Sequence, residues 1–247
     1  MLKSKRKQLI MASLERDDYV TLDFLTTQTE TSESTIRRDL DELEAQGLLT
    51  RVHGGAERRH YLREELSNQQ KSVKNAHDKA LIAKRAAQLI EEHDVVFIDS
   101  GTTTEFLIDQ IMPKDITVVT NSIHHAARLV DKGVKTIIIG GMVKIATDAS
   151  IGQMAIEQIS RLNLDKAFIG MNGVDDAFLT TPDLDEAAIK RTIMANSQQT
   201  FILADASKLG QKAFIKVDTI DKASLITSKC DLSLLQTIKK KMKVIEV

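Results

Sequence analysis

The sequence contains one cysteine, Cys230, and no long apolar run. A single cysteine excludes an internal disulfide framework and suits a reducing, cytoplasmic compartment. A membrane-spanning helix needs roughly 18 consecutive apolar residues, so none is expected. Basic residues at positions 3–7 resemble the start of a signal peptide, but no sustained apolar stretch follows them, which argues against export. The composition, 42% hydrophobic and 28% charged over 247 residues, instead indicates a globular protein with ample core.

Motifs for metals and nucleotides are also missing. The six histidines are scattered, and none shares a metal-ligand spacing with the cysteine or with carboxylates. There is no Walker P-loop and no GxGxxG motif, which disfavours nucleotide-driven and NAD-dependent functions. We therefore expect neither a metal site nor a cofactor.

The charge balance gives no overall preference for nucleic acid. The net charge is −1, and residues 1–56 hold eight Lys/Arg against ten Asp/Glu. A simple nucleic-acid coat would carry a clear basic excess. Any contact with DNA must therefore depend on where the positive side chains lie.

The first part of the chain predicts three short helices followed by a hairpin. Apolar side chains recur at helical spacing over residues 3–16, 21–28 and 33–46, and the stretch 49–55 then alternates before a double glycine. Thr21 and Ser32 are suited to cap the second and third helices, and Gly47 to end the third.

The third predicted helix has the pattern of a DNA-recognition helix. Ile36, Leu40 and Leu43 fall on one face and are expected to be buried, which turns the opposite side outward. The residues expected to face DNA near the helix start are Ser34, Thr35, Arg37 and Arg38. Acidic residues one turn later could hold the arginines in position. For an Arg-Arg pair alone, the alternative is a solvated helix whose charges pair among themselves.

The hairpin supplies a further basic surface. Arg51 and His53, with Gly54 and Gly55 allowing close backbone approach, suit contact with phosphates or the minor groove. With the short polar turn 29–32 before the third helix, these features predict a winged helix-turn-helix over residues 1–56 that binds double-stranded DNA.

Residues 57–76 are highly charged and predict a boundary between domains, either an exposed helix or a mobile linker, and a different pattern occupies residues 77–247. Short apolar runs alternate there with amphipathic helical stretches, which predicts an α/β domain with a parallel sheet covered on both faces. The predicted strands are 95–99, 116–120, 136–141, 166–173 and 200–205. The predicted helices are 80–92, 105–111, 122–132, 153–162 and 185–196.

Polar turns follow the predicted strands and mark a ligand site. The stretch DSGTTT joins a strand to a helix, where backbone amides and hydroxyl groups can hold a phosphate; a merely polar turn with a threonine cap is the alternative. Similar turns follow four other strands at the same sheet edge, where open α/β sheets bind ligands. The candidate effector-binding residues are Asp99, Ser100, Gly101, Thr102, Thr103, Thr104, Asn121, Gly140, Gly141, Lys144, Asn172, Gly173, Asp205 and Lys208.

STIRRDLDELEAQGLLTRVHGGA resembles the N-terminal signature of the DeoR family of bacterial transcriptional regulators. The resemblance continues through HDKALIAKRAAQLI, FIDSGTTT, VVTNS, IIGG, AFIGMNGV and ADASKLG, and so covers nearly the whole chain. It implies a repressor of sugar catabolism whose sensor domain resembles sugar-phosphate isomerases and acyl-CoA transferases. HDK, TNSIHHA and IIIGGMVKIATDASIG are most similar to fructose-operon repressors, which implies fructose 1-phosphate as the effector. His124 and His125 are either helix-surface residues or part of that site.

The same resemblance separates a sensor from an enzyme. Pentose-phosphate isomerases carry an Asp-Gly-Ala-Asp-Glu stretch and a lysine-glycine loop, where this chain has Asn172 and residues 180–183 (TTPD). An amide cannot act as a general base near neutral pH, so no catalytic residue is predicted. Glu186 and Lys190 form either an exposed i,i+4 pair or polar residues of the pocket.

These patterns favour a DNA-binding repressor that works as a homo-oligomer, a dimer or a tetramer, and that responds to a phosphorylated sugar. The alternatives are an isomerase-like enzyme with an accessory helix-turn-helix and a protein-interaction module built on a winged helix. Under the first hypothesis, the effector favours one arrangement of the sensor domains, and residues 57–76 transmit the change to the heads.

Overall fold

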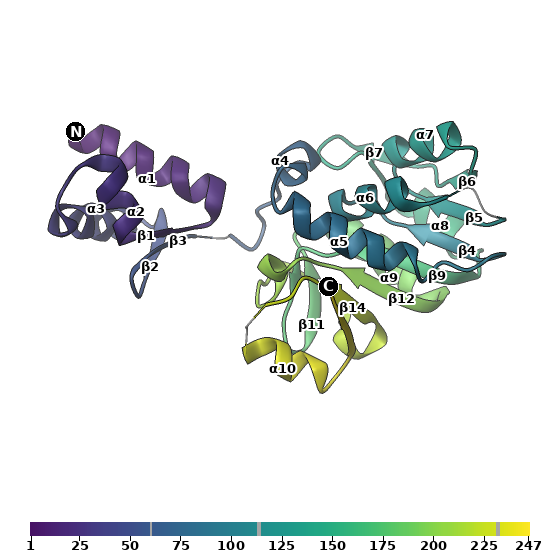
Figure 1. The fold of residues 1–247 in the computed structure, drawn as a ribbon. Helices are drawn as coiled ribbons and strands as arrows, with labels where there is room; N and C mark the ends of the chain where they lie inside the picture. Colours follow the sequence, from purple (N-terminus) through teal and green to yellow (C-terminus); the bar gives the residue numbers. More distant parts are fainter. Residues whose placement is uncertain (60, 113–114, 231–232) are drawn as a thin grey trace. The chain divides into compact units, whose positions relative to one another are not determined.

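The computed structural model describes residues 1–59, 61–112, 115–230 and 233–247. They form two compact units, Met1–Tyr61 and Leu62–Val247 (Figure 1). The predicted boundary at residue 56 falls inside a strand, because the hairpin needs a second strand that continues to Arg58. The charged stretch from Leu62 onward belongs to the second unit and includes a short helix, so it is not a free linker throughout.

The first unit, called the head below, is a three-helix bundle with a small antiparallel sheet. Its helices are α1 (Lys3–Asp17), α2 (Leu22–Thr29) and α3 (Glu33–Ala45). Its strands are β1 (Tyr19–Thr21), β2 (Leu49–Val52) and β3 (Gly55–Arg58), in the order β1-β3-β2. This arrangement confirms the predicted winged helix-turn-helix and adds β1, a strand that the sequence pattern did not predict.

Two of the three predicted helix caps are present in the head. Thr21 Oγ1 accepts a hydrogen bond from the Phe24 amide at 3.0 Å, and Gly47 follows α3 with a φ of +71°, which favours glycine. Ser32 precedes α3 as expected, but its hydroxyl bonds to the hydroxyls of Ser34 and Thr35 rather than to a backbone amide.

The second unit is built on a seven-stranded sheet in which every pair of neighbours is parallel. In spatial order the strands are β15 (Lys243–Glu246), β14 (Ser224–Thr227), β12 (Ser197–Leu203), β9 (Leu164–Gly170), β4 (Val95–Ile98), β5 (Thr117–Thr120) and β6 (Lys135–Ile138). Five of these strands were predicted. The parallel sheet therefore confirms the expected fold class, while β14 and β15 extend it on one side.

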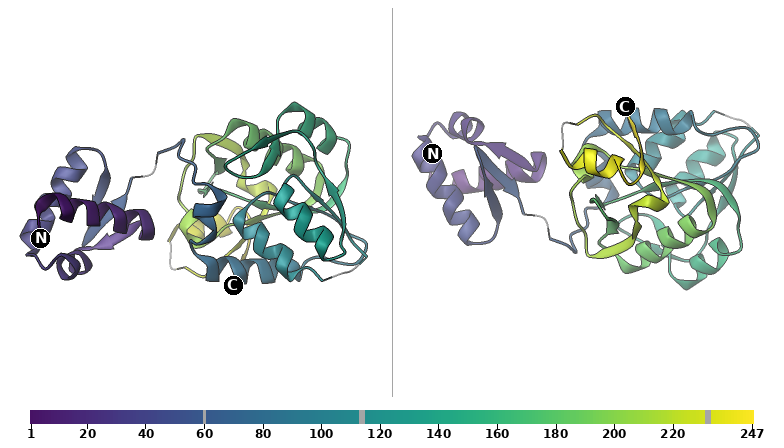
Figure 2. Two further views of the ribbon diagram at one scale, coloured as in Figure 1. Left: turned by 90° about the horizontal axis from the view of Figure 1, so that it is seen from above. Right: turned by 90° about the horizontal axis from the view of Figure 1, so that it is seen from below.

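Helices cover both faces of this sheet (Figure 1; Figure 2). They are α4 (Asn68–Ser72), α5 (Ala76–Ala87), α6 (Thr102–Gln110), α7 (Ile123–Asp131), α8 (Gln153–Ile159), α9 (Leu184–Ala195) and α10 (Ser233–Lys239). Successive strand residues point to opposite faces. Val96 and Ile98 therefore pack with α5, α6 and α7, whereas Phe97 lies in the core shared with α8, α9 and α10.

Two smaller elements lie outside the main sheet. The hairpin β7 (Met142–Lys144) and β8 (Ala149–Ile151) follows β6. A second antiparallel sheet has the order β10 (Gly173–Val174), β11 (Phe178–Thr181) and β13 (Ile215–Thr219). Short 3-10 helices occupy Ala206–Lys208 and Ile220–Lys222.

The strand order creates a switch point between β4 and β9. The chain runs outward from β4 through β5 to β6, then returns to β9 beside β4 and continues outward the other way. Open α/β sheets bind ligands in the crevice at such a point, beyond the carboxyl ends of the strands. Within the described parts of the chain, no helix is long and apolar enough to cross a membrane, and no three His, Cys, Asp or Glu side chains gather closely enough to hold a metal ion.

Candidate functional site

Helix α3 presents its arginines outward. Ile36 and Leu40 are fully buried and Leu43 is 2% exposed, as the periodicity predicted. Arg37 and Arg38, on the other side of the helix, are exposed, together with Ser34, while Thr35 is half-buried. The head thus presents two exposed arginines near the start of its third helix.

The ion pairs around this surface differ from the expected ones. Arg37 pairs with Glu33, one turn before it, at 2.5 Å, rather than with Asp41 or Glu42. Asp41 instead pairs with Arg51 on the hairpin. Within residues 1–59, Arg38 forms no ion pair, so its guanidinium is available to a phosphate or a guanine base without breaking an internal contact.

The hairpin candidates fall into two groups. His53 and Gly54 are exposed at the turn, and Arg51 is half-buried. Gly55 is buried in the pairing of β3 with β1, and a Cβ atom there would lie 2.0 Å from the Val20 carbonyl oxygen. Close strand packing therefore accounts for the glycine at position 55, and its contact with DNA stays a prediction.

A buried ion pair that the sequence analysis missed joins α1 to α3. Arg6 Nε and Nη2 donate to the two carboxylate oxygens of Asp39 at 2.6 and 3.2 Å. Both side chains are buried. Because burial of a single unpaired charge is costly, the two residues depend on each other, and together they fix α3 against the bundle.

At the switch point of the second unit, Asp99 links three elements. Its Oδ2 accepts a hydrogen bond from the Gly170 amide at 3.1 Å, which joins the ends of β4 and β9. The ammonium of Lys190, on α9, also donates to Asp99 Oδ2 and donates to the Gly170 carbonyl at 3.1 Å. Glu186 and Lys190 are both buried, so the exposed-pair alternative is wrong, and their place in a ligand pocket stays a prediction.

The DSGTTT turn leads into α6 as predicted, with Gly101 at the N-cap. Thr104 is committed to the turn itself, because its hydroxyl donates to the Asp99 carbonyl at 2.6 Å and accepts from the Gly101 amide at 2.9 Å. The hydroxyl groups of Ser100, Thr102 and Thr103 make no hydrogen bond to another described residue. These three are therefore the hydroxyls of the turn that a ligand could use.

The turns after β5 and β6 are largely structural. Asn121 is buried; its amide donates to the Ser150 carbonyl at 3.3 Å, while its Oδ1 has no hydrogen-bond partner among the described residues. Gly140 donates its amide to Gln158 at 3.1 Å. A Cβ on Gly141 would lie 2.8 Å from a carbonyl oxygen of β8, so that glycine permits close packing of the loop.

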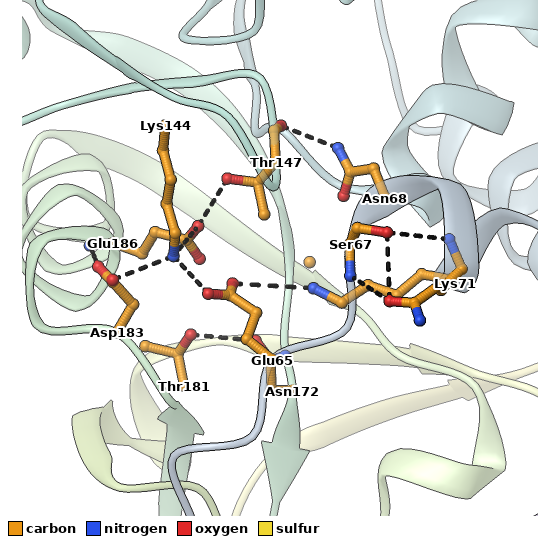
Figure 3. Close-up of polar contacts among 12 residues, drawn as sticks. Glu65, Ser67, Asn68, Lys71, Lys144, Thr147, Asn172, Thr181, Asp183 and Glu186 are labelled. Carbon is orange, nitrogen blue, oxygen red and sulfur yellow. Dashed lines mark hydrogen bonds and ion pairs between the residues drawn. The ribbon is translucent and has the colours of Figure 1, made fainter. Parts of the chain in front are cut away.

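Lys144 is the centre of a second charged cluster (Figure 3). Its ammonium lies 2.5 Å from Glu65, 3.0 Å from Asp183 and 3.1 Å from Glu186. Burial lowers the pKa of Lys144, but these carboxylates outweigh it and raise the pKa overall. Thr147 donates its hydroxyl to Glu186 at 2.9 Å, and Lys144 and Lys190 keep the pKa of that buried carboxyl low.

The remaining predicted site residues have varied roles. Asn172 accepts from the Thr181 hydroxyl at 3.0 Å, and a Cβ on Gly173 would lie 2.3 Å from a backbone oxygen. Asp205 is buried and accepts from the Asn75 amide at 2.9 Å, and Lys208 is half-buried. Gly173 is thus explained by packing, whereas the polar groups remain candidates.

Four charged residues at this site were not predicted: Glu65, Lys71, Lys79 and Asp183. Lys79 is buried and donates to the Lys71 carbonyl, and burial lowers the pKa of Lys79 to about 8. Glu65 and Lys71 lie in the stretch that the sequence analysis assigned to the linker. The sequence pattern around these two residues gave only a weak indication of a site, since a charged run is equally typical of a solvated segment.

The two adjacent histidines have different environments. His124 is exposed and lies 3.1 Å from Glu105. His125 is buried, and burial lowers its pKa to about 3, with smaller contributions from His124 and Arg128. Its Nδ1 has no hydrogen-bond partner in the described parts of the chain.

Comparisons with known proteins agree with this organisation. Residues 6–61 match the model of the DeoR-like helix-turn-helix domain, and residues 74–229 match that of the DeoR C-terminal sensor domain. The chain belongs to the DeoR family of transcriptional regulators. It is a DNA-binding regulator with a helix-turn-helix head and an effector-binding sensor domain, in a family of regulators rather than enzymes.

Individual relatives cover most of the chain. It is 43% identical over 230 residues to the uncharacterised HTH-type transcriptional regulator FruR of Bacillus subtilis, covering 92% of each. It is 32% identical over 220 residues to the lactose phosphotransferase system repressor of Staphylococcus aureus, covering 87% of this chain and 88% of the relative. Among solved structures, ribose 5-phosphate isomerase A of Methanocaldococcus jannaschii is similar with a TM-score of 0.40 and 16% identity over 55% of each chain.

Proposed function

We propose that this protein represses a sugar catabolic operon and that a phosphorylated sugar controls its affinity for the operator. Fructose utilisation is the first candidate and fructose 1-phosphate the first candidate effector, since the relative that covers 92% of each chain carries the name FruR. The protein would act in the cytoplasm on repeated half-sites, as a dimer or a tetramer.

The observation that carries this proposal is the chemistry of the switch-point site. A sugar phosphate needs cations for its phosphate and hydrogen-bonding groups for its hydroxyls. Lys144 and Lys190 supply buried or half-buried ammonium groups. Asp99 and Glu186 supply acceptors, and the free hydroxyls of the DSGTTT turn lie beside Asp99 in the chain.

The head supplies the other half of the proposal. Arg38 projects from α3 without an internal ion pair among the described residues, and Arg37, His53 and Gly54 are exposed around it. This is the arrangement in which a recognition helix reads the major groove while a wing contacts the backbone.

A titration of operator binding against phosphorylated sugars tests the proposal. Fructose 1-phosphate should change operator affinity at a lower concentration than other sugar phosphates, and unphosphorylated fructose should have no effect. If another sugar phosphate acts first, the fructose assignment is wrong. If no member of the panel changes operator affinity, the effector class itself is wrong.

A further inference from the structure

The segment between Leu62 and Asn68 is fixed at both ends across the ligand site. The Leu62 carbonyl accepts a hydrogen bond from the Phe214 amide at 2.8 Å. At the other end, the Asn68 amide donates to the Ala146 carbonyl at 3.0 Å, and its side chain donates to the Thr147 carbonyl at 2.8 Å. The segment therefore passes over the Lys144 cluster, and it begins where the second unit begins.

Glu65, in the middle of this segment, lies between two lysines (Figure 3). Its Oε2 is 2.5 Å from Lys144, and its Oε1 is 3.9 Å from Lys71. The Oε1 atom is buried and has no hydrogen-bond partner among the described residues. A buried carboxylate with one oxygen unsatisfied is a poor fit to its surroundings.

Lys71 depends on Glu65 for its charge balance. Burial lowers the pKa of Lys71, and Glu65 and Glu186 oppose that effect, while Lys190 and Lys208 add to it. In the described parts of the chain, Glu65 is the only carboxylate that forms an ion pair with Lys71. Lys144, by contrast, keeps Asp183 and Glu186 as partners when Glu65 leaves.

A phosphate group would satisfy the two lysines better than Glu65 does. A phosphate monoester carries about −1.5 to −2 charges at neutral pH and offers three strong acceptor oxygens, whereas a carboxylate carries one charge on two oxygens. It could therefore bridge Lys144 and Lys71 with normal hydrogen bonds to both ammonium groups.

We propose that Lys71 and Lys144 bind the phosphate of the effector, and that Glu65 occupies this position until the phosphate displaces it. The inference rests on the proposed function, because it takes the effector to be a phosphorylated sugar. Binding would then release the segment that follows Tyr61, which is where the chain leaves the head. This links the two sites physically, because the ligand determines the position of Glu65, and Glu65 determines whether the segment after Tyr61 is held in place.

The direct test is phosphate binding by full-length Glu65→Gln, measured calorimetrically with inorganic phosphate and with fructose 1-phosphate. Removing the competing charge should tighten both affinities by about tenfold relative to the wild type. Lys71→Met should weaken both. Glu157→Gln, which removes an exposed carboxylate on α8 held by Gln153, is the matched control and should leave both affinities unchanged.

A second readout uses the operator. Without any sugar phosphate, the operator affinity of Glu65→Gln should move toward the value that the wild type reaches at saturating fructose 1-phosphate. This holds whether the effector weakens or strengthens DNA binding, because both changes remove Glu65 from Lys71 and Lys144.

The outcomes separate this inference from the proposed function. If the wild type binds fructose 1-phosphate and responds on the operator, but Glu65→Gln binds it no more tightly, the inference is overturned and the proposed function stands. The phosphate would then lie elsewhere, for example at the α6 turn. If neither inorganic phosphate nor fructose 1-phosphate binds to the wild type or to any variant, both are overturned.

Discussion

At the scale of single residues, the Arg6–Asp39 pair makes a strong prediction about the head. Both side chains are buried and bonded to each other through two hydrogen bonds. Asp39→Ala leaves the Arg6 charge without a partner, and breaking a buried pair in this way costs roughly 3–5 kcal/mol. The midpoint of urea unfolding of the head should fall accordingly.

The natural fluorescence of the protein allows this measurement. The sequence has no tryptophan, and its two tyrosines, Tyr19 and Tyr61, both lie in the head, so tyrosine emission follows that unit alone. Asp41→Ala is the control, because Asp41 pairs with Arg51 on the surface. Losing that pair should lower the free energy of unfolding by less than about 1 kcal/mol. Equal effects of the two substitutions would contradict the assigned importance of the buried pair.

His125 makes a prediction about pH. Its pKa is about 3 in the folded protein and about 6.5 when unfolded, because burial disfavours the charged ring. Above pH 6.5 the ring is neutral in both states and has no effect. As the pH falls from 6.5 toward 3, only the unfolded chain gains the proton, which destabilises the fold by roughly 1.4 kcal/mol per pH unit.

Urea unfolding followed by circular dichroism at pH 7, 5.5 and 4.5 measures this loss. His125→Leu should lose less stability with acid than the wild type, since it cannot take up the proton. His124→Gln, which removes only the smaller His124 contribution to the pKa of His125, should keep most of the wild-type pH dependence. An unchanged acid response in His125→Leu would show that other groups control it.

Residue-scale prediction from the sequence succeeded where one element alone fixes a side chain. Ile36, Leu40 and Leu43 repeat along one helix, so the exposure of Arg37 and Arg38 followed from local geometry. The roles of Glu65 and Lys71 depend on contacts with residues far along the chain, which no local pattern contains. The same holds for Gly55, whose environment is created by pairing with β1.

At the scale of elements, helix α3 is expected to decide operator recognition. Arg38→Ala removes an exposed guanidinium that has no internal ion pair within residues 1–59, so it should abolish specific operator binding without unfolding the head. Binding of sugar phosphate in the second unit should be intact.

Operator binding by the wild type should also weaken steeply with salt, with a log–log slope of roughly −0.9 per phosphate neutralised.

The matched comparison for Arg38 is Arg16→Ala, which removes an arginine from the end of α1, where Asp17 holds it. That variant should bind the operator like the wild type. If Arg38→Ala keeps full operator affinity, α3 is not the recognition helix.

Elements were predictable to the extent that their own residues define them. The long amphipathic helices show a clear hydrophobic periodicity and the buried central strands are clear apolar runs. Five strands of the parallel sheet were predicted in this way. The strand β1 has three residues and exists because β3 pairs with it. Strand β15 is only partly buried and alternates charged and apolar residues, so its four residues carry little apolar signal.

At the scale of the whole molecule, we propose that the head and the switch-point site are coupled. The stretch expected to be a linker, residues 57–76, is divided between the two units, and its part from Leu62 onward contacts Lys144 through Glu65. A ligand that rearranges this part can therefore influence the chain that carries the head. The charged pattern suggested a linker, but no local pattern could show that Glu65 pairs with Lys144.

Reciprocity tests this coupling most directly. Coupling requires that operator and effector change each other's affinity by the same factor. The affinity for fructose 1-phosphate is measured by calorimetry with and without saturating operator DNA, and operator affinity is measured with and without saturating sugar. We predict that the two ratios are equal and differ from one. A sugar affinity that is identical with and without bound operator would contradict the coupling.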